Sequence, residues 1–210
     1  MTYSIKELFY TLQGEGYHTG QPAVFCRFAG CNLWSGQEKD RQTAICPFCD
    51  TNFLGVDGLN GGRYQARELA RKAIHLWPRE NGGQPFIVCT GGEPLLQLDA
   101  PLLKALHHEG FYVAVETNGT LPPPSGIDWL CVSPKARTQL VVTRGDELKL
   151  VYPQEGLEPE SLTKLSFDHF YLQPLNDSQG ERNTRWAVQY CLVHPGWKLS
   201  LQTQKILQIP

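Results

Sequence analysis

The stretch Phe86-Ile87-Val88-Cys89-Thr90-Gly91-Gly92-Glu93-Pro94 joins a short apolar run to a Gly-Gly-acid turn. The apolar run predicts a buried strand, and two successive glycines let the backbone come close to a small charged ligand. On either side, strand-like segments alternate with segments that carry apolar residues at helical spacing. The predicted strands are 8–10, 24–28, 86–89, 111–115, 129–132, 148–151, 170–172 and 198–201, and the predicted helices are 65–77, 98–108, 159–165 and 185–193. This alternation indicates a parallel α/β fold.

Polar residues follow several of these strands at the point where each strand ends. The segments concerned are 90–93, 116–119, 133–135 and 173–176. Because parallel sheets carry their chemistry at the carboxyl ends of strands, we expect these segments to meet on one rim. About six strand–helix units fit into the chain, whereas a complete eight-unit barrel needs roughly 250 residues. We therefore expect a single domain over residues 1–210, built as a partial (β/α)6-type TIM barrel with its active site on that rim.

The composition is that of an ordinary globular protein. The chain has 210 residues, of which 41% are hydrophobic and 19% charged, so we expect neither disorder nor a membrane protein. The net charge of −2 gives no general attraction for polyphosphate and argues against bulk nucleic-acid binding. No charged segment followed by a long apolar run opens the sequence, so no secretory signal is expected. These features favour a cytoplasmic protein, in which the seven cysteines would be mostly reduced.

Three cysteines, Cys31, Cys46 and Cys49, precede the Gly-Gly-acid turn. Three thiolates can hold a cubane iron–sulfur cluster and leave its fourth iron open to a substrate. One alternative is a zinc site completed by a histidine such as His18. Another is a dithiol redox site at Cys46 and Cys49, which would leave Cys31 and the turn unexplained. The remaining cysteines lie in apolar segments and are interpreted as core residues: Cys26, Cys89, Cys131 and Cys191.

The C-x14-C-x2-C spacing, the GGEP motif and an acidic residue after the next strand resemble the radical S-adenosylmethionine (SAM) superfamily. The usual superfamily spacing is C-x3-C-x2-C, so this chain carries an 11-residue insertion within an enlarged cluster-binding loop at about 31–62. Further segments are similar to the 7-carboxy-7-deazaguanine synthase family, and the resemblance covers essentially the whole chain. These segments are 11–16 (TLQGEG), 25–34 (FCRFAGCNLW), 48–51 (FCDT), 116–120 (ETNGT), 133–135 (SPK) and 202–210 (QTQKILQIP).

This resemblance implies a lyase of queuosine biosynthesis that converts 6-carboxy-5,6,7,8-tetrahydropterin to 7-carboxy-7-deazaguanine with loss of ammonia. It also implies a homodimer with a compact, modified partial barrel, and a 4Fe-4S cluster, SAM and Mg²⁺ as cofactors. The implied metal ligands are Cys31, Cys46 and Cys49 for the cluster and Thr51 for Mg²⁺. The implied SAM contacts are Phe48, Asp50, Gly91, Gly92, Glu93, Glu116, Ser133, Lys135, Gln173 and Asn176. The implied substrate contacts are Leu12, Gln13, Gly14, Glu15, Arg27, Thr90 and Pro210.

Several of these side chains suit their roles chemically. The carboxylate of Glu116 can accept from two ribose hydroxyls, and Glu93 would face the SAM ammonium or brace the turn. Arg27, on a strand where a buried arginine is costly, would pair with the pterin carboxylate. The carboxylate of Pro210 would accept from the pterin ring. Without the family resemblance, the dipeptide at 50–51 would be interpreted as a helix N-cap.

Two other functions compete with this interpretation. A radical-SAM activase, which installs a glycyl radical on a partner protein, can also carry GGEP, but the predicted pterin-binding segments argue against it. A zinc-stabilised interaction module is the third possibility. For the lyase we expect a small-molecule pterin substrate, a second copy of the chain and an electron donor such as a flavodoxin as partners. The loop at 32–45 is a candidate seat for the donor or for the partner subunit.

Overall fold

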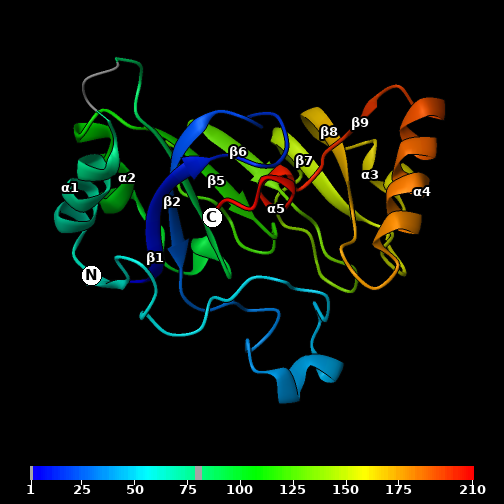
Figure 1. Ribbon diagram of the computed structural model, residues 1–210, viewed down its shortest axis with the longest axis horizontal. Helices are drawn as coiled ribbons and strands as arrows, with labels where there is room; N and C mark the ends of the chain where they lie inside the picture. Colours follow the sequence, from blue (N-terminus) through cyan, green and yellow to red (C-terminus); the bar gives the residue numbers. More distant parts are fainter. Residues whose placement is uncertain (1, 79–81) are drawn as a thin grey trace.

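In the computed structural model, which describes residues 2–78 and 82–210, nine strands form one sheet. The strands are β1 (Tyr3–Leu12), β2 (Pro22–Phe28), β3 (Gly62–Tyr64), β4 (Phe86–Gly91), β5 (Tyr112–Thr117), β6 (Trp129–Val132), β7 (Arg144–Tyr152), β8 (Ser166–Pro174) and β9 (Trp197–Leu199). The α-helices are α1 (Ala66–Leu76), α2 (Ala100–His108), α3 (Pro159–Leu162), α4 (Gly180–Val193) and α5 (Thr203–Leu207), and the 3-10 helices are η1 (Glu38–Thr43) and η3 (Pro94–Leu96). Figure 1 shows α1 and α2 grouped at one end of the sheet and α3 and α4 at the other.

The sheet is mostly parallel and open. Its order is β3-β1-β2-β4-β5-β6-β7-β8-β9, in which all neighbours from β2 to β9 are parallel and β1 is antiparallel to both β2 and β3. The predicted α/β class is confirmed. Because β3 and β9 end the sheet without meeting each other, a barrel is not confirmed. Residues 118–128 and 133–143, which connect β5 to β6 and β6 to β7, form no helix, so these two connections do not supply the helical layer of a regular barrel.

Helices α1 and α2 begin where the sequence supplies caps. The side chains of Gln65 and Glu68 form a capping box at the start of α1. Helix α2 begins two residues after its predicted start because the carboxylate of Asp99 accepts a hydrogen bond from the N–H of Leu102 at 3.1 Å. The buried faces of these two helices consist of Leu69, Ala70, Ala73, Ile74, Leu102, Leu103 and Leu106.

Two main hydrophobic clusters hold the helices to the sheet. One joins α1 and α2 to strands β1, β2, β4 and β5, and the other joins α3 and α4 to β7, β8 and β9. The helices therefore pack on the flanks of the sheet, and the carboxyl ends of the central strands stay open to loops. Within residues 2–78 and 82–210, no helix combines the length and the apolar character that crossing a membrane requires.

Several elements differ from the predicted ones. The segment 32–62, predicted as a loop, contains the 3-10 helix η1, and in Figure 1 this helix projects away from the sheet. Helix α4 begins at Gly180, five residues before the predicted start at 185. Helix α5 was not predicted, because its five residues are too few to show a helical repeat of apolar side chains. The early start of α4 was not predicted because Asn183, the buried residue of its first turn, is polar and gives no apolar signal.

Candidate functional site

The turn after β4 packs directly against the segment that carries Cys31. Gly91 has a φ of 131°, and a Cβ atom on Gly92 would lie 2.0 Å from the carbonyl oxygen of Gly30. The N–H of Glu93 donates to the same carbonyl at 2.9 Å. Neither glycine can gain a side chain unless the backbone moves. The turn therefore holds Cys31 beside the carboxyl end of β4.

A cavity of about 180 Å³ lies at this end of the sheet, and all three predicted cluster ligands border it. Burial raises the pKa of the Cys31 and Cys49 thiols, and it raises that of Cys46 to about 11. The N–H of Leu33 lies 3.4 Å from Sγ of Cys31, where it would stabilise a thiolate. Protein thiolates are the ligands that iron–sulfur clusters require, so this donor set fits a cluster.

The zinc alternative fits less well. Within residues 2–78 and 82–210, no group of three His, Cys, Asp or Glu side chains is arranged to hold a metal ion. A zinc ion needs its ligands around one atom, whereas the thiolates of a cubane each bind a different iron. In addition, His18 does not border the cavity of the three cysteines. Its ring packs against Trp129, with centroids 4.5 Å apart.

Nine of the ten predicted SAM residues border the same cavity. They are Phe48, Asp50, Gly91, Gly92, Glu116, Ser133, Lys135, Gln173 and Asn176. Nζ of Lys135 donates to the carbonyl and the hydroxyl of Ser133, at 2.6 and 2.7 Å. Burial lowers the pKa of Lys135, since little solvent is left to stabilise its charge. An anionic group of a bound molecule would supply that stabilisation.

Glu93 is the exception among these ten residues. It is fully buried, and its carboxylate accepts from Oγ1 of Thr117 at 2.7 Å, from the N–H of Asn118 at 2.8 Å and from the N–H of Leu95 at 3.0 Å. Because it caps η3, its side chain turns into the protein and does not border the cavity. Of its two predicted roles, the geometry supports bracing of the turn and not contact with SAM.

A second cavity, of about 380 Å³, adjoins the first. All seven predicted substrate residues border it: Leu12, Gln13, Gly14, Glu15, Arg27, Thr90 and Pro210. The residues that border both cavities are Glu15, Asp50, Thr51, Thr90, Glu116, Gln173 and Gln202. Molecules in the two cavities would therefore lie next to each other.

Lys149, a residue that the sequence analysis missed, is buried at the border of the first cavity and pairs with two carboxylates of this shared wall. Its Nζ lies 2.6 Å from Oε2 of Glu15 and 3.4 Å from Oε1 of Glu116. Glu116 also accepts from Nε2 of Gln13 at 3.1 Å and from Oγ1 of Thr90 at 3.2 Å. Glu116 was predicted to accept from two ribose hydroxyls, and in the structure three protein donors already share its oxygens.

Charge pairing dominates the titration of this network. Burial alone would raise the pKa of Glu15, but the Lys149 ammonium and two amide donors lower it to about 2. Burial alone would likewise lower the pKa of Lys149, yet Glu116 and Glu15 hold it well above its usual value. Both shifts have the direction of an ion pair, so Glu15 is an ionised acceptor in the second cavity.

Arg27 is oriented by a partner that the sequence analysis did not identify. Its Nε lies 2.7 Å from Oε1 of Glu7, on the neighbouring strand β1. A guanidinium has five N–H donors in a fixed fork, and this contact engages one of them. Arg27 therefore borders the second cavity with its position fixed and with donors still available to a carboxylate.

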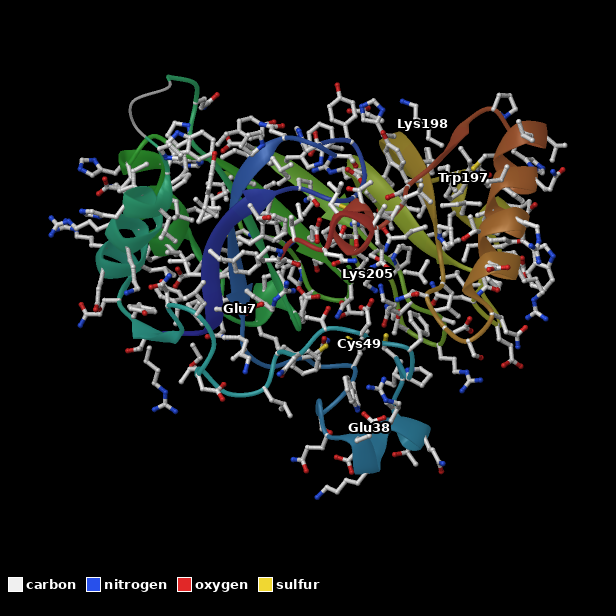
Figure 2. All side chains as sticks on the ribbon, in the orientation of Figure 1. Glu7, Glu38, Cys49, Trp197, Lys198 and Lys205 are labelled. Carbon is white, nitrogen blue, oxygen red and sulfur yellow. The ribbon has the colours of Figure 1, made fainter. Side chains whose placement is uncertain are left out.

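The C-terminal segment contacts residues that border both cavities. Nε2 of Gln202 and Nε2 of Gln204 each donate to Oε1 of Glu15 at 3.0 Å. Lys205 forms an ion pair with Asp50, next to the cysteine turn. Figure 2 shows Lys205 near the middle of the molecule, where the C-terminal segment passes in front of the sheet. The C-terminal segment, which includes α5, thus contacts the cluster loop at Asp50 and the border of the second cavity at Glu15.

Arg41 anchors the enlarged loop to the cysteine turn. Its Nη1 donates to the carbonyls of Pro47 and Cys49 at 2.7 and 3.0 Å. Its Nε and Nη2 bind the carboxylate of Glu38 at 2.6 and 2.9 Å, and its guanidinium lies 4.1 Å from the ring centroid of Trp34. Figure 2 shows Glu38 on the projecting part of the loop and Cys49 at its base.

Thr51 borders both cavities, beside Asp50. The dipeptide does not cap a helix, since residues 44–61 are described and form none. Mg²⁺ prefers oxygen ligands and keeps several from water or substrate, so a single protein hydroxyl at the junction of two cavities fits a loosely held ion. Asp50 is already engaged by Lys205 and by Gln202, which leaves Thr51 as the candidate ligand.

Three thiols, one buried and two partly buried, and a glycine turn lie together at the strand ends of an open α/β sheet, and this combination defines a radical-SAM enzyme. The chain is 58% identical to 7-carboxy-7-deazaguanine synthase of Bordetella pertussis and 56% identical to that of Burkholderia multivorans, with 100% of each chain covered in both cases. The crystal structure of QueE from Escherichia coli is similar, with a TM-score of 0.72 at 31% identity, over 96% of this chain and 94% of that chain. No protein-family model matches. The chain belongs to the 7-carboxy-7-deazaguanine synthase family.

Proposed function

We propose that this chain is a radical-SAM lyase of queuosine biosynthesis, which converts 6-carboxy-5,6,7,8-tetrahydropterin to 7-carboxy-7-deazaguanine with loss of ammonia. The observation that carries the proposal is the pair of adjoining cavities, one bordered by three cysteines and the other by polar groups suited to a carboxylated pterin. The full-length relatives from Bordetella pertussis and Burkholderia multivorans are named for this activity.

The first cavity would hold the cofactors. Cys31, Cys46 and Cys49 would ligate a 4Fe-4S cluster, and SAM would lie along the glycine turn. When bound, the cluster and SAM supply one-electron radical chemistry that protein side chains do not provide. Lys135 would meet the SAM carboxylate, since burial leaves its charge in need of a partner. The chain's own contribution is to position the cofactors and to exclude water.

The second cavity would hold the substrate. Arg27, oriented by Glu7, would pair with the pterin carboxylate. Glu15, kept ionised by Lys149, would accept from the guanidine-like edge of the ring. Thr51 would ligate a Mg²⁺ ion that orients the substrate carboxylate. The remaining predicted substrate contacts are Leu12, Gln13, Gly14, Thr90 and Pro210.

Four further expectations complete the proposal. The chain would act as a single domain derived from a partial (β/α)6 barrel, with the enlarged cluster loop at about 31–62. It would form a homodimer and receive electrons from a donor such as a flavodoxin. The projection of the segment 32–45 away from the sheet in Figure 1 supports this loop as a seat for the donor or the second subunit. A cytoplasmic location stays a prediction from the sequence.

Anaerobic turnover tests the activity. Protein loaded with about four iron and four sulfide per chain is incubated with SAM, a reductant, Mg²⁺ and carboxytetrahydropterin. We expect the deazapurine product, with one ammonia released per product. Cys46→Ala should bind the pterin but form no product. Fully loaded protein that leaves the pterin unchanged would contradict the proposal, and a glycyl-radical activase would behave in that way.

A further inference from the structure

A third cavity, of about 10 Å³, shares Glu15 and Glu116 with the two cavities described above. Its other walls include His18, Ala114 and Glu147. This volume is close to the smallest that holds one water-sized molecule. The third cavity therefore has room for a single small species, directly against two carboxylates of the reaction site.

The unpartnered polar atoms around this cavity are hydrogen-bond acceptors. Glu147 is only 3% exposed, and its Oε1 has no partner within residues 2–78 and 82–210; the same is true of Nε2 of His18. Nδ1 of His18 lies 2.8 Å from Oε1 of Gln21, which can only accept, so Nδ1 carries the proton and Nε2 is an acceptor. Nε2 of Gln13, an amide donor on the wall, gives one of its two N–H groups to Glu116. An occupant that satisfies both unpartnered acceptors must itself donate.

The charges around the cavity favour a cation. Three carboxylates border it, those of Glu15, Glu116 and Glu147. The ammonium of Lys149 pairs with the first two. When all three carboxylates are ionised, the single positive charge of Lys149 does not neutralise them. An uncompensated charge in a dry interior is costly. A single additional positive charge in the third cavity would offset that cost.

The surroundings of Glu147 also favour a bound cation. Its Oε2 accepts from the N–H of Tyr17 at 3.2 Å and from Nε1 of Trp129 at 3.3 Å, both long for such bonds. Burial raises the pKa of Glu147 even though the charge of Lys149 acts to lower it, so Lys149 does not fully offset the burial of this carboxyl. The rings of Trp129 and Phe86 complete the walls, and aromatic faces attract cations.

We propose that the third cavity binds one ammonium ion, formed when ammonia released in the reaction takes up a proton from solvent. Ammonium is about the size of a water molecule, carries one positive charge and has four N–H donors and no acceptor, which matches the unpartnered acceptors of His18 and Glu147. Mg²⁺ demands six close oxygen ligands and keeps several waters, for which the cavity is too small. This inference rests on the proposed function, because Glu15 and Glu116 place the cavity next to the site of ammonia loss.

Anomalous diffraction with rubidium, a monovalent cation close in size to ammonium, tests the site directly. In crystals of the holoprotein soaked in rubidium chloride, we expect a peak in the third cavity that added ammonium chloride removes. Glu147→Gln should abolish the peak, whereas Glu155→Gln, a change at an exposed carboxylate, should retain it. No peak in the unchanged protein, or a peak that persists in Glu147→Gln, would overturn the inference and leave a water as the occupant.

A second variant keeps the test valid if Glu147→Gln does not fold. Ala114→Val adds two methyl groups to the cavity wall and keeps every charge, so it should also remove the rubidium peak. In turnover assays we expect ammonium chloride to inhibit product formation more than sodium chloride does. Either variant should weaken that inhibition about tenfold or more, the loss expected from one charge-assisted contact. Equal inhibition of the variants and the unchanged protein counts against the site.

These measurements separate the two proposals. Protein that forms the deazapurine but shows no rubidium in the third cavity keeps the proposed function and loses the ammonium site. Protein that holds rubidium there but releases no ammonia loses the proposed function, and with it the assignment of the cavity to ammonium.

Discussion

Nζ of Lys149 lies 2.6 Å from Oε2 of Glu15, and only 5% and 15% of the two side chains are exposed. The other carboxylate oxygen of Glu15 accepts from the amides of Gln202 and Gln204. One buried ion pair therefore ties strand β7 to the C-terminal segment and to the turn after β1. Because solvent screens such a pair only weakly, it keeps Glu15 ionised beside the second cavity.

Stability should fall at acid pH because of Glu15. Burial would raise its pKa, but Lys149 overrides this and sets the value at about 2, below the ordinary 4.5. A carboxyl with a lowered pKa contributes stability above its unfolded pKa, and that contribution is lost as the pH falls through the folded value. We expect this group to remove about 3 kcal/mol from the free energy of unfolding between pH ~5 and ~2. Urea unfolding at several pH values measures it.

The matched comparison is Glu15→Gln against Glu155→Gln, whose side chain is 94% exposed. Glu15→Gln should lose most of this acid dependence, whereas Glu155→Gln should follow the unchanged protein. Identical pH profiles for the two variants would show that the Glu15 ion pair does not contribute.

Removal of Lys149 alone should lower the free energy of unfolding more than removal of Lys149 together with the charge of Glu15. Lys149→Met leaves Glu15 and Glu116 buried without their cation, and we expect a loss of about 3–5 kcal/mol in the free energy of unfolding. The double variant Lys149→Met/Glu15→Gln should recover part of that loss, since one of the unpaired charges is gone. Urea unfolding at neutral pH checks both values, with the exposed Lys164→Met as control. Strictly additive effects would argue against coupling between the two residues.

The parts of the site that the sequence predicted are those with strong local signals. The run from Phe86 to Cys89 followed by Gly91 and Gly92 predicts both the strand and the turn, and the structure has β4 and the close contact with Gly30 there. The cysteine motif likewise predicts a common site for three thiols, and all three border one cavity. Such features depend on a few neighbouring residues, and their chemistry allows few alternatives.

The missed residues act through partners that are distant in sequence. Lys149 sits between the buried Leu148 and Leu150 in β7, and a charge in such a strand is the signal that could have identified it. Its partner Glu15 is 134 residues away, so no local pattern specifies the pair. Glu93 belongs to a recognisable motif, but its direction is set by donors on β5 and in the loop after it, which the motif does not contain.

Arg41 should hold the cysteine turn in place. Arg41→Met removes the hydrogen bonds to the carbonyls of Pro47 and Cys49. We expect hydrogen exchange of the amides in 44–50 to rise about tenfold or more in cluster-free protein, and iron to be lost faster in air after loading. Lys39→Met, an exposed change on the same 3-10 helix, is the control. Unchanged exchange in Arg41→Met would mean that the loop holds the turn by other contacts.

Gly92 should tolerate no side chain, because its neighbour is backbone and cannot rotate away. A Cβ atom there would lie 2.0 Å from the carbonyl oxygen of Gly30 and 3.0 Å from Cβ of Cys31. Gly92→Ala should therefore destabilise the protein by about 3 kcal/mol or more and lower its iron content after loading, because relief of the overlap moves a cluster ligand. Gly196→Ala, at a site with open space around it, should leave both thermal unfolding and iron content unchanged. If Gly92→Ala kept its stability but lost iron, the turn would serve the cluster alone; if it kept both, the close approach of the turn to Cys31 would have no role in either.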